Sequence, residues 1–158
     1  MTKLTLPSGE KKAMEKKLKI KGTAINRGVF QGEALVSKTP FGFLGAVDPS
    51  TGIVIDKRHE LVGENIANKV MIFPEGRGST VGAIIILELA RCGTSPGAIV
   101  NRTTEPILAS GAILAGKFYH RTIPVIHRLK KDPIELIKTG DVVRVDGDRG
   151  EITIFQKG

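Results

Sequence analysis

The chain has 158 residues, of which 41% are hydrophobic and 25% charged, a composition typical of one globular domain with a sizeable core. Its net charge of +8 favours an anionic partner or substrate, and its single cysteine excludes an intrachain disulfide. One cysteine also cannot hold an iron–sulfur cluster, which normally takes about four thiolates. Because no disulfide can form within the chain, we expect a cytoplasmic protein. No apolar stretch reaches the ~18 residues of a membrane span, so we expect that the protein does not enter a membrane.

Residues 1–17 have no stable hydrophobic period and carry five lysines, which predicts a basic flexible extension followed by one domain over residues 18–158. Alternating apolar side chains then predict strands at residues 18–25 and 33–37. Glycines and prolines predict a structured loop over residues 39–52, with a further strand at residues 53–56.

The second half of the chain alternates predicted strands and helices. The expected elements are a buried strand at 69–73, a helix at 79–90 that stops at Cys92-Gly93, a strand at 98–101, a helix at 105–115, a strand at 124–127 and a hairpin within 139–155. The first helix has almost no charged side chains, so we expect it to be buried nearly all round. This order predicts an α/β fold with helices packed outside a sheet.

The junction between the strand at 69–73 and this helix reads FPEGRGSTVG and contains Gly76, Arg77, Gly78, Ser79 and Thr80. A P-loop requires a lysine after the second glycine, and a dinucleotide-binding turn requires GxGxxG, so neither nucleotide motif fits. Helix N-termini offer unpaired N–H groups and positive potential, and glycines allow close approach of a ligand. The residues by themselves therefore leave open a plain helix cap made by Ser79 and a site for an anion.

Other functional classes find less support. The closing segment GDVVRVDGDRGEITI resembles the swivelling phosphohistidine domains of phosphotransfer synthases, but no histidine lies on the helix that would carry the phosphate. The three histidines have no metal-ligand spacing and are predicted to be ordinary surface or loop side chains. Aromatic and basic residues are not interleaved, so we expect no binding of nucleic acid.

Three segments, read together, resemble the small subunit or fused small domain of the aconitase X family. They are GAVDPSTGIVID (45–56), HELVGENIANKVMIFPEGRGSTVGA (59–83) and EPILASGAILAG (105–116) with a following IPV. The resemblance covers about residues 18–156. One departure is Gly45-Ala46, where the family commonly has two glycines.

The resemblance implies a swivelling β/β/α domain, similar to the mobile domain of aconitase. Such a domain closes over a [4Fe-4S] cluster that cysteines of a large subunit hold, which makes the large subunit the partner in a heterodimer. Archaeal members dehydrate (R)-5-phosphomevalonate to trans-anhydromevalonate 5-phosphate in a mevalonate pathway, and bacterial relatives dehydrate cis-3-hydroxy-L-proline. The substrate is therefore expected to be a small anionic molecule.

The resemblance also assigns roles to residues. The proton-abstracting serine of the family falls on Ser79. The expected substrate-binding residues are Gly76, Arg77, Gly78 and Thr80 around an anion pocket, and Gly45, Asp48 and Thr51 in a loop that faces the substrate or the large subunit. A serine alkoxide stabilised by ~5 pKa units requires ~7 kcal/mol, so a helix dipole, Arg77 and exclusion of water must act together. Two alternatives stay open: a hydroxyproline dehydratase subunit, and a non-catalytic domain in which the turn only caps a helix.

Overall fold

The computed structural model describes residues 16–78 and 80–156, which form one large sheet, a two-stranded sheet and three helices. The strands are β1 (Lys16–Lys21), β2 (Thr23–Asn26), β3 (Val29–Val36), β4 (Val47–Asp48), β5 (Ile53–Val54), β6 (Val70–Phe73), β7 (Ala98–Asn101), β8 (Val125–His127), β9 (Val142–Asp146) and β10 (Glu151–Gln156). The helices are α2 (Val81–Cys92), α3 (Pro106–Tyr119) and α4 (Pro133–Leu136). The expected α/β class is confirmed.

The large sheet closes on itself through the first two strands. Its order is β1-β10-β9-β3-β6-β7-β8-β2, so β1 and β2 pair with opposite ends of the sheet although only Gly22 separates them in the chain. A β-carbon at Gly22 would lie 2.6 Å from the side chain of Leu129 and 2.9 Å from the carbonyl oxygen of His127. Glycine is therefore required where the chain passes from one end of the sheet to the other.

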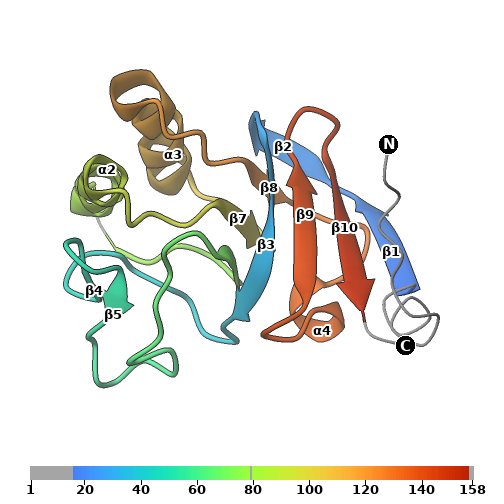
Figure 1. Cartoon of the computed structure of the whole chain (residues 1–158), viewed down its shortest axis with the longest axis horizontal. Coiled ribbons are helices and arrows are strands. Elements are labelled where there is room, and N and C mark those ends of the chain that lie inside the picture. The colour runs from blue at the N-terminus through green and yellow to red at the C-terminus, as the bar shows by residue number, and fades with distance from the viewer. Residues whose placement is uncertain (1–15, 79, 157–158) are drawn as a thin grey trace, which may run out of the picture.

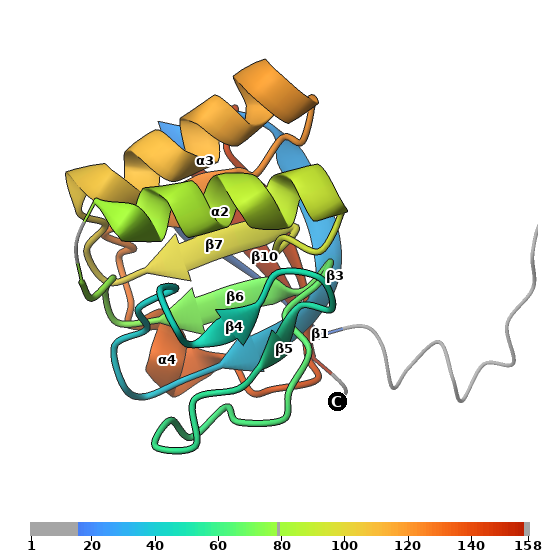
Figure 2. The same ribbon diagram turned by 90° about the vertical axis from the view of Figure 1, so that its left-hand side faces the viewer.

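Strands β3, β6, β7 and β8 run parallel and form the part of the sheet that the helices cover. Figures 1 and 2 show α2 and α3 side by side on one face of this part, with β4 and β5 beside them. Parallel strands are normally covered on both faces and then read as continuous apolar runs. All four residues of both β6 and β7 are buried.

The alternation of side chains along these strands divides the core in two. Val70 and Ile72 face an inner core formed with β1, β9, β10 and α4, whereas Met71 and Phe73 face an outer core under α2, α3 and the loops. The glycine-rich turn therefore begins at the end of a strand that is fixed from both sides.

Several predicted boundaries differ from the observed ones. The prediction for β7 is confirmed, but β3 begins four residues earlier than expected, because its first half is held by antiparallel pairing with β9. Helix α3 continues to Tyr119 and ends at His120 in the left-handed conformation, and α4 was not anticipated. Lys16 and Lys17 of the expected extension belong to β1, whereas residues 1–15 lie outside the described part of the chain.

The expectation that the first helix is buried nearly all round is wrong. Helix α2 buries Ile86, Leu89 and Ala90, but Ile84 is 60% exposed and Val81 is 37% exposed. The reason is that α2 packs against α3 on one side and the outer core on another, so its remaining face meets solvent. Within residues 16–78 and 80–156, no helix is both long and apolar enough to cross a membrane.

Candidate functional site

The carboxyl ends of the parallel strands meet at one edge of the sheet, where open α/β proteins usually bind ligands. The segments that leave β6 and β7 are joined there, since the N–H groups of Arg102 and Thr103 both donate to the carbonyl of Pro74. The segment after β8 joins them through a 3.0 Å bond from the Arg128 N–H to the carbonyl of Arg102. The glycine-rich turn after β6 is thus part of a continuous rim.

The segment after β3 holds the glycine-rich turn by backbone contacts. The N–H of Phe41 donates to the carbonyl of Glu75 at 3.2 Å, and the N–H of Arg77 donates to the carbonyl of Phe41 at 3.1 Å. Gly42 lies so close that a β-carbon there would be 2.5 Å from the Arg77 carbonyl oxygen. Gly78 has φ +115°, a conformation that glycine adopts readily and other residues do not.

A small depression lies between this turn, α2 and α3, and its lining includes Phe41, Phe43, residues 76–78 and Glu105. The carboxylate of Glu105 is committed to the start of α3, where it accepts from the N–H groups of Ile107 and Leu108 at 2.7 Å. Arg77 is exposed, and among the described residues no carboxylate forms an ion pair with it. The guanidinium is therefore available to an anionic ligand.

The predicted site residues Gly76, Arg77 and Gly78 line this depression together. A β-carbon at Gly76 would lie 3.0 Å from Oε1 of Glu105, so the glycine gives the turn room beside α3. Ser79 lies outside the described residues, and its role as base or cap stays a prediction. Thr80 is exposed at the start of α2, and its side chain makes no capping hydrogen bond.

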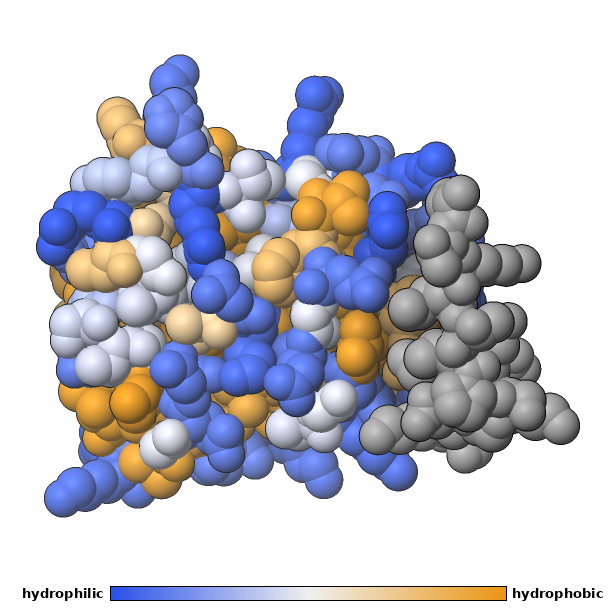
Figure 3. All heavy atoms as spheres, viewed as in Figure 1, coloured by the Kyte–Doolittle hydropathy of each residue, from blue (hydrophilic) through white to orange (hydrophobic). Residues whose placement is uncertain are grey.

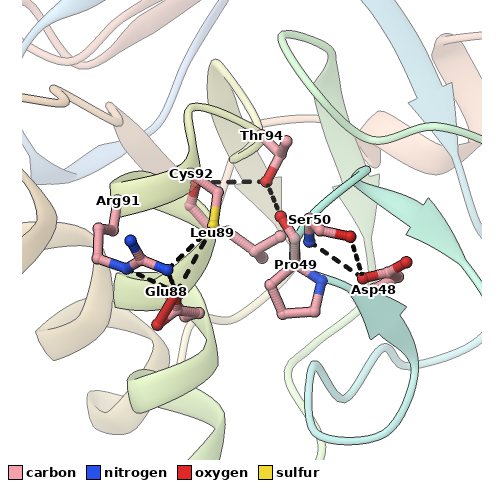
Figure 4. A network of polar contacts seen from close by, with 8 residues as sticks. All are labelled: Asp48, Pro49, Ser50, Glu88, Leu89, Arg91, Cys92 and Thr94. Atoms are coloured by element: carbon pink, nitrogen blue, oxygen red, sulfur yellow. Dashed lines mark hydrogen bonds and ion pairs between the residues drawn. The ribbon is translucent and has the colours of Figure 1, made fainter.

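The structure does not bring Gly45, Asp48 and Thr51 into the same depression. The carboxylate of Asp48 accepts from the N–H and hydroxyl of Ser50 at 3.0 and 2.8 Å, and these bonds hold its pKa below the usual range. The carbonyl of the intervening Pro49 accepts from the Thr94 hydroxyl, which also donates to Leu89 at the carboxyl end of α2 (Figure 4). This turn therefore contacts the end of α2 opposite to the glycine-rich turn.

Gly45 lies in the loop before β4 with φ +73° and nothing within 4 Å of the position of a β-carbon. Exposed hydrophobic residues of this loop layer are Leu44, Ile53, Ile55 and Val62. Figure 3 shows hydrophobic side chains gathered at the lower left of the molecule, over the region of β4 and β5.

His127 is a further polar group of the rim, although the sequence predicts an ordinary surface or loop residue at this position. It is only 6% exposed, and its Nδ1 accepts from the N–H of Thr104 at 2.8 Å. The hydroxyl of Thr104 donates to Asn101 Oδ1, and Asn101 Nδ2 donates to the carbonyl of Phe73. Burial, and then the charge of Arg128, hold the pKa of His127 below its ordinary value. The position of His127 at the end of a predicted strand is the available signal.

No residues suited to a metal centre gather within the described ranges, where no group of three histidine, cysteine or acidic side chains can hold an ion. The single thiol, Cys92, is exposed and makes contacts with Glu88 and Arg91. These residues do not fit an iron–sulfur cluster, which requires several thiolates.

The fold and a match to a family model together identify the chain as a swivel domain. The family model of the aconitase X swivel domain matches residues 19–154, and the chain belongs to this family. The expected swivelling domain is thereby confirmed. Aconitase X enzymes are hydro-lyases and typically depend on an iron–sulfur cluster.

Individual relatives show which enzyme subunits of the family the chain resembles. The chain is 45% identical over 141 residues to the phosphomevalonate dehydratase small subunit of Methanosarcina mazei, covering 89% of this chain and 94% of the relative. It is 48% identical over 137 residues to the subunit of the same name from Methanocella arvoryzae, covering 87% and 99%. The crystal structure of Thermococcus kodakaraensis aconitase X, in its holo form, superimposes with a TM-score of 0.79 at 41% identity, covering 88% of this chain and 99% of that one.

Proposed function

We propose that this chain is the small subunit of a phosphomevalonate dehydratase and completes the active site of a large subunit. The observation that carries the proposal is the similarity of nearly the whole chain to subunits of that name, together with an exposed arginine in a glycine-rich turn at the edge of the sheet. The substrate carries a carboxylate and a phosphate, so a cationic rim suits it.

The proposed task of this chain is to bind the anionic substrate and to remove a proton from it. Arg77 and the amide groups of Gly76 and Gly78 would attract and orient an anionic group of the substrate. Ser79, which follows them in the chain, would abstract the proton next to the carboxylate. A serine hydroxyl needs a positive, water-poor environment to act as a base, and Arg77 and a helix N-terminus supply part of that field.

The iron–sulfur cluster of the proposed complex would belong to the large subunit. This chain has one cysteine, which is exposed, and the described residues offer no other cluster ligands. The purified chain should therefore contain neither iron nor sulfide and should have no activity alone. A brown, active preparation of this chain by itself would contradict the proposal.

The test is reconstitution with a large subunit of the family followed by assay of two substrates. We expect dehydration of (R)-5-phosphomevalonate and no turnover of cis-3-hydroxy-L-proline, whose single carboxylate is offset by its ring ammonium. Preferred turnover of hydroxyproline would replace the proposed substrate. Stable complex formation without turnover of either would favour a non-catalytic interaction domain.

The role of Ser79 is tested in the same complex with a matched pair of substitutions. Ser79→Ala should lower kcat at least ~10³-fold, because it removes the proposed base, while a lost helix cap would cost only ~1 kcal/mol of stability. Ser110→Ala is the control, since Ser110 is an exposed helix residue whose hydroxyl, within the described part of the chain, bonds only to the carbonyl of Pro106. If Ser79→Ala retains kcat within tenfold of Ser110→Ala, Ser79 is not the base.

A further inference from the structure

The segment HEL at residues 59–61 belongs to the motif that carries the family resemblance, yet it lies outside the depression. One carboxylate oxygen of Glu60, Oε1, accepts four hydrogen bonds from the segment that follows β3. The donors are the Ser37 hydroxyl at 2.7 Å, the Lys38 N–H, the Thr39 N–H at 3.0 Å and the Thr39 hydroxyl at 3.2 Å. A single side chain thus fixes three consecutive residues more than twenty positions away.

His59 strengthens the same connection. Its Nδ1 accepts from the N–H of Leu61 at 3.0 Å, so the remaining proton of the neutral ring lies on Nε2. Nε2 is 3.1 Å from the carbonyl oxygen of Pro40, to which it donates, and 3.2 Å from the Thr39 hydroxyl oxygen. The imidazole also packs edge-on against Phe41, with ring centroids 5.1 Å apart.

Residues 37–40, which Glu60 and His59 hold, are followed directly by Phe41, whose backbone contacts the glycine-rich turn. Phe41 is fully buried and packs against both Phe43 and Phe73. Its backbone makes one hydrogen bond to Glu75 and accepts one from Arg77. A displacement of residues 37–40 must therefore move the backbone that carries Arg77, since the tightly packed rings leave Phe41 no independent freedom.

The charge of Glu60 matters because all four donors converge on one oxygen. Hydrogen bonds to a carboxylate are about twice as strong as bonds to a neutral acceptor. Partial burial raises the pKa of Glu60, but the bonds from Ser37, Lys38 and Thr39 outweigh it, so the pKa lies below its ordinary value. The carboxylate is ionised at neutral pH and acts as a fixed anchor.

We propose that Glu60 is a positioning residue that, through Ser37, Thr39 and Phe41, holds the backbone of Arg77 in the orientation that binds substrate. Glu60 does not line the depression, so we assign it no part in proton transfer. The proposal assigns a function to the HEL segment, and its effect on substrate binding rests on the proposed function of the Arg77 turn.

Amide hydrogen exchange of the full chain tests the connection without any assay of activity. Glu60→Ala should accelerate exchange at the N–H groups of Thr39, Phe41 and Arg77 about tenfold or more, and Glu60→Gln by a smaller factor, because the amide oxygen accepts more weakly. Glu64→Ala is the control, since Glu64 is an exposed carboxylate of the same loop. Exchange of the buried Val100 amide, which reports global unfolding, should accelerate by a smaller factor than exchange at Phe41 and Arg77 in Glu60→Ala.

Wild-type exchange at Phe41 and Arg77 in Glu60→Ala would overturn the proposal. Where Glu60→Ala does not fold, Ser37→Ala gives a related test, because it removes one donor to Glu60, together with the contacts of the same hydroxyl to the Thr39 backbone, and leaves the carboxylate in place. Ser37→Ala should accelerate exchange at Phe41 and Arg77 about threefold. Unchanged exchange in that variant would equally overturn the proposal.

The reconstituted complex gives the second measurement. Glu60→Ala should raise the KM for phosphomevalonate about tenfold, change kcat less than about threefold and leave the pH profile of kcat in place, with partial recovery of KM in Glu60→Gln. A large loss of kcat with unchanged KM would make Glu60 part of the chemistry and overturn the positioning role. If the wild-type complex does not dehydrate phosphomevalonate, the proposed function fails, while hydrogen exchange still decides whether Glu60 holds the turn.

Discussion

The close approach of Gly42 to the glycine-rich turn makes Gly42→Ala a sharp test of how that turn is held. A β-carbon at this position would lie 2.5 Å from the carbonyl oxygen of Arg77 and 3.3 Å from its carbonyl carbon. Non-bonded heavy atoms pack at about 3.5 Å, so the two backbone segments must separate by about 1 Å. Both segments are backbone, and neither can yield by rotating a side chain.

That separation stretches two hydrogen bonds beyond the bonding distance. They are the 3.2 Å bond from Phe41 to Glu75 and the 3.1 Å bond from Arg77 to Phe41. Each net hydrogen bond contributes about 1 kcal/mol, and strain adds to the loss, so Gly42→Ala should lower the free energy of unfolding by about 2–3 kcal/mol. For a domain of this size the melting temperature should fall by about 5–10 °C.

Thermal unfolding followed by circular dichroism measures the effect, with Gly116→Ala as the matched control. Gly116 lies in helix α3, and among residues 16–78 and 80–156 the nearest atom that a β-carbon there would meet is the Arg121 carbonyl oxygen, at 3.8 Å. Alanine is favoured over glycine in a helix by about 1 kcal/mol, so this variant should melt about 2–4 °C higher than the wild type. A Gly42→Ala protein that melts like the wild type and binds substrate normally would refute the reasoning about the turn.

Three further predictions concern charge, pH and the orientation of α2. Arg77→Ala should raise the KM for phosphomevalonate at least about tenfold. It should also reduce the increase of KM with added salt, because it removes the attraction between the guanidinium and the anionic substrate that salt screens. A KM and a salt dependence like those of the wild type would argue against contact between Arg77 and the anion. The pKa of His127 is lowered on folding, so the unfolded chain binds more protons than the folded one below the ordinary histidine value of about 6.5. The contribution of His127 to the free energy of unfolding is therefore complete above that pH and is lost as the pH falls toward the folded pKa. The melting temperature should fall less steeply from pH 7 to pH 5 in His127→Asn than in the wild type, because asparagine keeps an acceptor for the Thr104 N–H and does not titrate. Ile86→Ala should cost about 2–4 kcal/mol in urea unfolding, whereas Ile84→Ala on the exposed face should cost less than about 0.5; equal losses would mean that α2 is covered on both faces.

Elements with a local signal are predictable from the amino-acid sequence alone. Strand β7 matches its prediction residue for residue, because Ala98–Asn101 is a short apolar run between turn residues. The closing hairpin was also predicted, since valines and isoleucines alternate on both sides of an Asp-Gly turn. The glycine-rich turn stood out for the same reason: strand, glycines and helix follow one another within ten residues, and the family motif includes them.

Features that depend on contacts between distant segments are visible only in the folded chain. Only the closed sheet shows why Gly22 is needed, and only the pairing with β9 explains why β3 begins at Val29. His127 is buried where its ring accepts from the N–H of Thr104 in the segment after β7, and Ile84 is exposed because it lies on the face of α2 that packs against neither α3 nor the outer core; no local period expresses either outcome.

The candidate site also has one part that the sequence predicts and another that only the folded chain shows. The sequence predicts a site at Arg77 and its flanking glycines, and a separate loop with Asp48 and Thr51 that faces the substrate or the large subunit. The structure shows that the turn of Asp48 contacts the far end of α2. The sequence does not predict that Glu60 holds the segment after β3, because the groups that donate to its carboxylate lie more than twenty positions away in the chain. Local patterns fix the elements and their turns, while the partners of a polar side chain are fixed only when the folded chain brings its donors within hydrogen-bonding distance.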